Sequence, residues 1–153
     1  MTAANRTGQP TSIPTSRKVV CFIYGVIAVA ALIATWSNGG PYVHSATDFL
    51  VTFWRDAKVT SASRFLAADA LMLAISVVIL MVIEARKHRV RFVWLYVAGS
   101  FFIAISVMFP LFLIARELGM SASDAPRLRI PDTIVLAVLA VLTVALTVWI
   151  DMK

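Results

Sequence analysis

Asp69 is the residue whose type and position most strongly suggest chemistry, because it is the one acid in an apolar run from Phe65 to Ile83. If that run spans a membrane, Asp69 lies about 6 Å below its outer end, where a carboxylate is costly unless paired, hydrated or protonated. Arg116 ends another apolar run, and its long side chain reaches back toward a membrane. We therefore predict an Asp69–Arg116 ion pair joining two helices. The alternative is a proton or cation site, although no second carboxylate lies at a matching depth.

The other reactive residue types form no pattern typical of an enzyme or a metal site. The two histidines, His44 and His88, fall in predicted loops on opposite sides of the membrane, and Cys21 is the single cysteine. A metal or haem site in the bilayer needs clustered histidine, cysteine or carboxylate ligands. There is also no phosphate-binding glycine loop, no G-x-S-x-G and no nucleophile beside a base. We predict no catalytic activity, no cofactor and no metal.

The composition identifies the protein class that must position these residues. Of the 153 residues, 60% are hydrophobic and only 14% are charged. A soluble domain has roughly half apolar and about a quarter charged residues, and a small one has too little interior to bury such an excess. The single cysteine excludes a disulfide scaffold, and no basic groove with interleaved aromatic residues indicates nucleic acid binding. The composition therefore predicts an integral membrane protein.

Four apolar runs, over residues 19–36, 65–83, 92–115 and 134–150, are each long enough to cross ~30 Å of hydrocarbon as a helix. They lack the polar–apolar alternation of barrel strands. We predict an all-α, four-helix membrane domain over residues 17–153, after a disordered cytoplasmic tail, 1–16. Pro110 lacks an amide hydrogen and predicts a kink in the third helix, either static or a hinge.

Lysine and arginine residues predict the orientation of these spans. With four crossings, eight of the 14 basic residues fall on the side of both termini and six on the other. The short turn between the second and third spans decides the assignment, because it holds four of the eight directly at the membrane edge. Both termini are therefore predicted to be cytoplasmic.

The segment 48–58 between the first two spans has the spacing of a short amphipathic helix. Phe49, Leu50, Phe53 and Trp54 fall on one face of it, and most of the polar residues fall elsewhere. Such a helix is typical of the membrane interface, with its aromatic side chains inserted among the lipids. The alternative is a docking surface for a partner protein.

Several short strings resemble a family of small bacterial membrane proteins of unknown function. The resemblance runs from residue 19 to about 117 and rests on Ala67-Ala68-Asp69, on Glu84 with Arg86, and above all on Pro110-Leu111-Phe112-Leu113 followed by Arg116-Glu117. It implies a three-helix core in which Asp69, Pro110 and Arg116 have structural roles, with the fourth helix as an addition. It implies no activity.

The composition, rich in alanine and valine and poor in lysine, resembles that of a high-GC actinobacterium. The chain is also similar to a small accessory subunit of mycobacterial Mce-type lipid importers. That similarity implies the bacterial inner membrane as location, and permease subunits and the lipid bilayer as partners. We expect a noncatalytic accessory subunit that stabilises a larger membrane complex. The alternative is an autonomous transporter or channel that uses Asp69 as its intramembrane polar site.

Overall fold

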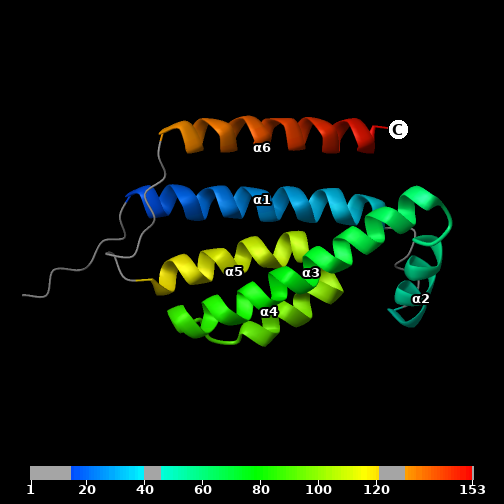
Figure 1. Cartoon of the computed structure of the whole chain (residues 1–153), viewed down its shortest axis with the longest axis horizontal. Coiled ribbons are helices and arrows are strands. Elements are labelled where there is room, and N and C mark those ends of the chain that lie inside the picture. Colours follow the sequence, from blue (N-terminus) through cyan, green and yellow to red (C-terminus); the bar gives the residue numbers. More distant parts are fainter. Residues whose placement is uncertain (1–14, 40–45, 121–129, 153) are drawn as a thin grey trace, which may run out of the picture.

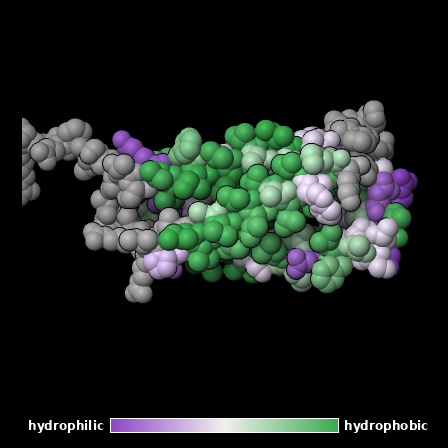
Figure 2. All heavy atoms as spheres, turned by 90° about the horizontal axis from the view of Figure 1, so that it is seen from above, coloured by the Kyte–Doolittle hydropathy of each residue, from purple (hydrophilic) through white to green (hydrophobic). Residues whose placement is uncertain are grey.

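The computed structural model of the chain is all-helical, and it describes residues 15–39, 46–120 and 130–152. Three long helices, α1 (Thr15–Gly39), α3 (Ser61–His88) and α6 (Ile130–Asp151), run along the molecule (Figure 1). Figure 2 shows hydrophobic side chains over the middle of one face, with hydrophilic side chains gathered toward both ends. This distribution is that of a membrane protein, because the hydrocarbon layer excludes charge.

Three segments are long and apolar enough to cross a bilayer: Arg17–Gly39, Ser61–His88 and Val93–Gly119. The apolar part of α6, Ile134–Ile150, is shorter. All four coincide with the apolar runs of the sequence, and each of the four is helical. Their arrangement in space, however, differs from four successive crossings.

The helix α3 is limited at both ends by local signals. Thr60 is its N-cap: the hydroxyl accepts a hydrogen bond from the Ser63 amide at 3.0 Å, and the Ser63 hydroxyl accepts one from the Thr60 amide at 3.0 Å. At the other end Arg89 adopts the left-handed conformation, with φ 54°. The Val90 amide then donates to the Ala85 carbonyl at 3.0 Å and closes the helix.

The segment after α3 is a helical hairpin. It consists of α4 (Val93–Gly99), one π-helical turn, η2 (Ser100–Ala104), and α5 (Ile105–Gly119). At Ala104 the backbone is extended, with φ 173° and ψ 144°, and the chain reverses direction. The rings of Tyr96 and Phe112 consequently lie 5.8 Å apart, whereas sixteen residues of straight helix would separate them by about 24 Å.

This hairpin differs from the single helix predicted over residues 92–115, because the apolar run folds into two arms that lie side by side. Pro110 lies inside α5, which continues through that residue, whereas the reversal of the chain lies at Ala104. Gly99 permits the close approach of the two arms, since a Cβ atom there would lie 2.6 Å from the Met108 Cε. Apolar residues line both arms, so periodicity alone cannot distinguish one long helix from two short ones.

The hydrophobic core lies between the hairpin and the last turns of α3. Met81 and Ala85 of α3 pack with Val93 and Val97 of α4, and with Phe112 of α5. Phe112 and Met81 are the largest fully buried side chains in the described part of the chain. The helix α1 packs along α5 on the other side of the hairpin.

The start of α1 and the ends of α3 and α5 meet at one end of the molecule, here called the Arg17 end. The opposite end, here the Ser61 end, holds the end of α1, the start of α3 and a short helix, α2 (Ala46–Asp56). The helix α6 begins at the Arg17 end and finishes at the Ser61 end (Figure 1). The first residues of α1 and the last of α6 thus lie at opposite ends of the molecule, whereas the sequence predicts both termini on one side of the membrane. The reason for this arrangement is that the hairpin begins and ends at the Arg17 end.

Of the remaining sequence predictions, the helix over residues 48–58 corresponds to α2. Residues 1–14 of the predicted tail lie outside the described part of the chain, and α1 begins at Thr15, before the predicted limit at residue 16.

Candidate functional site

Buried charges at the Arg17 end join three helices. The Arg17 guanidinium, on the first turn of α1, lies 3.8 Å from the Glu117 carboxylate on the last turn of α5. It also donates a hydrogen bond of 2.8 Å to the Met120 carbonyl. Both side chains of the ion pair are only 5% exposed. A pair so deeply buried holds the start of α1 against the end of α5.

A second set of charges connects α5 to α3. The Arg116 Nε donates to the Glu84 carboxylate at 2.5 Å, and its NH1 donates to Glu117 at 3.4 Å. The His88 Nε2 lies 3.3 Å from the same Glu84 carboxylate. We call Arg17, Glu84, His88, Arg116 and Glu117 the ion network. Its two guanidinium and two carboxylate groups balance in charge, which offsets the cost of removing them from water.

The predicted Asp69–Arg116 ion pair is wrong. Arg116 pairs with Glu84 and Glu117 at the Arg17 end, whereas Asp69 lies in the ninth position of α3, near the Ser61 end. The hairpin is the physical reason, because the reversal at Ala104 returns the end of α5 to the side from which α4 began. In the described part of the chain, Asp69 makes no ion pair or hydrogen bond and its side chain is exposed.

Sequence reasoning missed the partners of Glu84 and Glu117. The sequence does place charged residues of opposite sign at the ends of two apolar runs, since Glu84 ends one run and Arg116-Glu117 ends another. The ion pair was not predicted because those two ends were assigned to opposite membrane faces. In the structure the two runs end side by side, and a Cβ on Gly119 would lie 3.0 Å from the His88 carbonyl oxygen. The close approach of these helix ends brings the network together.

The ion network joins α1, α3 and α5. Each guanidinium is held by a carboxylate or a carbonyl of another segment, so the network fixes the hairpin relative to α1 and α3. Within residues 15–39, 46–120 and 130–152, no three histidine, cysteine, aspartate or glutamate side chains are grouped as a metal site would require. The arrangement therefore supports a positional role for these charges.

The predicted interfacial residues Phe53 and Trp54 lie near the end of α2 and are exposed. Their rings meet edge to face, with centroids 5.8 Å apart. Phe49 and Leu50 belong to the same helix, but their side chains lie outside the described ones. An exposed aromatic pair on a short helix suits a membrane interface or a protein partner equally well.

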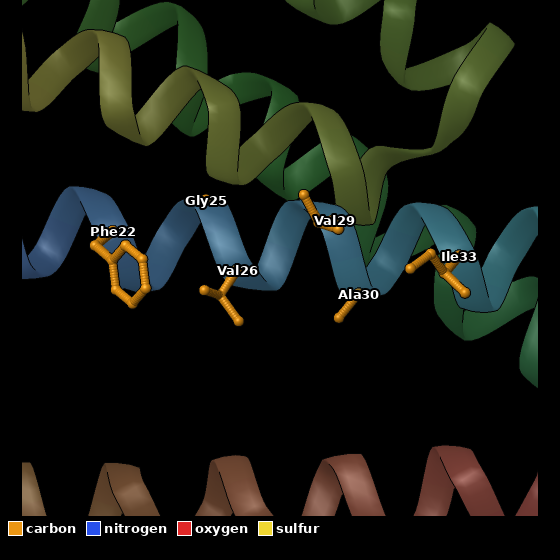
Figure 3. A pocket seen from close by; sticks show the side chains of 6 residues that line it. All are labelled: Phe22, Gly25, Val26, Val29, Ala30 and Ile33. Atoms are coloured by element: carbon orange, nitrogen blue, oxygen red, sulfur yellow. The ribbon is translucent and has the colours of Figure 1, made fainter.

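A shallow apolar groove of about 560 Å³ follows the outer face of α1. Its lining residues are Phe22, Gly25, Val26, Val29, Ala30 and Ile33. Figure 3 shows Phe22, Val26 and Ala30 pointing toward α6, which lies alongside without closing on them. A Cβ on Gly25 would meet nothing within 4 Å, so this part of α1 is open.

The helix α6 buries very few of its described side chains. All are exposed except that of Thr147, which is half-buried. The hydroxyls of Thr143 and Thr147 donate to carbonyls of their own helix, at 2.8 and 2.9 Å. The helix therefore presents an apolar surface without a free polar group from those two residues.

Comparison with known proteins identifies the family. No curated protein and no solved structure matches the chain. None of these comparisons supports similarity to an Mce-type importer subunit. The family model of the protein of unknown function DUF2834 matches residues 23–118, which cover most of α1, all of α2 to α4 and all but the last residue of α5, and omit α6. Because that match covers more than half of the sequence, the chain belongs to the DUF2834 family.

Proposed function

We propose that this protein is a noncatalytic accessory subunit, which binds and stabilises a larger membrane protein through α6 and the outer face of α1. The observation that carries the proposal is the exposed, uncharged surface of α6 along residues 134–150. A helix that forms part of the core of a protein buries one face against the neighbouring helices. This helix is added to the family segment without adding to its core.

The groove on α1 also supports docking of a partner on this surface. Gly25 and Ala30 contribute to the hollow because they have small side chains, and small residues let a neighbouring transmembrane helix approach closely. Van der Waals packing is the main attraction between helices in lipid, so an open apolar groove on α1 favours packing of a partner helix. We propose that one helix of the larger protein packs there.

We also propose that the Arg17 end faces the cytoplasm of a bacterial cell, with the inner membrane around α1, α3 and α6. Basic residues supply the argument, because cytoplasmic membrane edges are enriched in them. Among the described residues, that end holds seven, whereas the Ser61 end holds three. The seven are Arg17, Lys18, Arg86, Lys87, Arg89, Arg91 and Arg116; the three are Arg55, Lys58 and Arg64. At the opposite surface α2 would lie in the headgroup layer with Phe53 and Trp54 inserted.

Autonomous transport through Asp69 is the second candidate. Its specific support is the absence of any ion pair for this carboxylate among the described residues. Against it, Asp69 is exposed on α3, and a path for ions requires a polar lining. Flux of protons or cations into liposomes that contain only this protein, abolished by Asp69→Asn, would favour transport over an accessory role.

The test of the accessory role is affinity purification of the tagged full chain from its native membrane in mild detergent. We expect a larger membrane protein in stoichiometric amount, identified by mass spectrometry. A permease of a lipid importer would bear out the expected Mce-type partner, and another protein would replace it. Removing residues 130–153 should release the partner while the remaining chain stays folded by circular dichroism.

A point variant separates docking from folding. Gly25→Leu fills open space on α1, so we expect partner recovery to fall at least fivefold with unchanged thermal stability. Ala98→Leu enlarges an exposed side chain on α4 and serves as the matched control, with full recovery expected. Recovery of the partner with both Gly25→Leu and the chain lacking α6 would refute this docking surface.

A further inference from the structure

The outward face of α3 carries a second surface, independent of α6. Five exposed apolar residues follow one another along this face at intervals of three, four, three and four: Phe65, Ala68, Met72, Ile75 and Ile79. That is the spacing with which a helix meets another helix in a left-handed pair. We call these five residues the outer seam of α3. The face that packs on the hairpin, with Met81 and Ala85, is opposite to it.

Two charged residues flank the outer seam. At about 100° per residue, Asp69 lies on one side of it and Arg64 on the other. Asp69 makes no ion pair or hydrogen bond among the described residues, and Arg64 donates only to the Lys58 carbonyl, at 2.9 Å, and to the Ser61 hydroxyl, at 3.1 Å. Both side chains are exposed, so the contacts of Arg64 can exchange.

The separation of these two charges matches a parallel helix pair. In two parallel helices, a residue on one flank of the seam faces the residue five positions later on the other flank of the neighbouring helix. Arg64 and Asp69 are five positions apart. A second copy of this chain in the same membrane has the same orientation, so its α3 is parallel by necessity. Each Arg64 would then meet the Asp69 of the other copy, so the dimer would contain two such ion pairs.

We propose that two copies of this chain form a dimer in which the outer seams of α3 pack together and Arg64 of each copy pairs with Asp69 of the other. Charge complementarity selects a second copy as the occupant, because the chain itself carries the cation that Asp69 lacks, at the required spacing. A carboxylate about 12 Å along a membrane helix is costly on a lipid-exposed face, and the dimer removes that cost.

Disulfide trapping in native membranes tests the contact directly. In a Cys21→Ser background, Met72→Cys should form a covalent dimer of twice the monomer mass under mild oxidation. Leu73→Cys is the matched control. Leu73 is next to Met72 in sequence and is similarly exposed, at 60% against 65%, but it lies off the outer seam. We expect at least tenfold more dimer from position 72. Equal trapping at both positions, or trapping to a different protein, would overturn the proposal.

Charge reversal tests the ion pair. In liposomes containing the purified chain, Asp69→Arg should weaken dimerisation about tenfold, measured by energy transfer between labelled copies, because two pairs are lost. The double variant Arg64→Asp with Asp69→Arg restores opposite charges and should regain most of the affinity. Failure of the double variant to recover while the single variant is impaired would exclude the pair. This measurement needs no other protein, so its outcome is separate from that of the accessory role.

Discussion

The two ends of α3 place acidic side chains in very different surroundings. At the Arg17 end, Glu84 is held by Arg116 and lies beside His88, within a network in which Arg17 and Glu117 are almost fully buried. At the Ser61 end, Asp69 is exposed on an apolar face without such a partner in the described part of the chain. The first end satisfies its charges within one chain. The second leaves a charge that only another molecule, water or a proton can satisfy.

The difference comes from the hairpin. By reversing at Ala104, the segment 93–119 delivers Arg116 and Glu117 to the Arg17 end, and it leaves the Ser61 end of α3 without a covering helix. The charges at the Arg17 end thus stabilise the fold, whereas the Ser61 end of α3 is exposed and can bind another molecule.

The largest expected effect concerns topology, where the outcome is all or none. In a Cys21→Ser background, cysteines at Arg91 and Leu118 should both react with a membrane-impermeant maleimide from the same side, because both flank the hairpin. Val59→Cys should react only from the other side. If Leu118→Cys instead reacts together with Val59→Cys, the segment crosses the membrane and the hairpin is excluded.

The next effect concerns the buried pair. Arg17→Gln should lower the free energy of unfolding by about 3 kcal/mol, because the buried Glu117 carboxylate then keeps only its 3.4 Å contact with Arg116. Titration with SDS in mixed micelles, followed by circular dichroism, measures it. Replacing both residues, as Arg17→Met with Glu117→Met, should be less harmful than the single change, since no unpaired charge remains. A single variant as stable as the parent chain would show that the pair does not hold α1.

The two acids of α3 give a matched comparison. Glu84→Gln should cost about 2 kcal/mol, because it weakens a charged hydrogen bond to Arg116 in a partly buried site. Asp69→Asn should change the stability of the monomer by less than about 0.5 kcal/mol, as for an exposed substitution. The same titration at a protein concentration that keeps the chain monomeric compares them. Equal costs at both positions would remove the contrast between the two ends.

The smallest effect concerns the start of α3. Thr60→Ala removes the hydroxyl that accepts the Ser63 amide, and it should cost about 1 kcal/mol of stability. Hydrogen exchange at the first turn of α3 should rise, while the last turn, held by the ion network, should stay protected. Thr60→Ser keeps the hydroxyl and is the control. Faster exchange at both ends would mean that the helix opens as one unit.

Much of the fold was accessible from sequence. The apolar runs predicted the helices around residues 19–36, 65–83 and 134–150, and the spacing of Phe49 to Trp54 predicted α2. The family resemblance was correct, and its string ending in Arg116-Glu117 contains two members of the ion network. The candidate site was only half found, because the importance of Arg116 was predicted but its partner was not.

Hydrophobicity and local capping act over a few residues, so the class of protein and the places where helices form can be predicted from the sequence alone. The position at which the third apolar run turns depends instead on contacts between residues that are distant in sequence. One extended residue, Ala104, reverses the chain, and nothing in the composition around it differs from a straight span. That reversal depends on Met108 packing over Gly99 and on Phe112 meeting Tyr96, contacts between residues nine and sixteen positions apart. Because charges pair with whatever lies beside them in space, the same reversal gave Arg116 to Glu84 and left Asp69 on the outer surface.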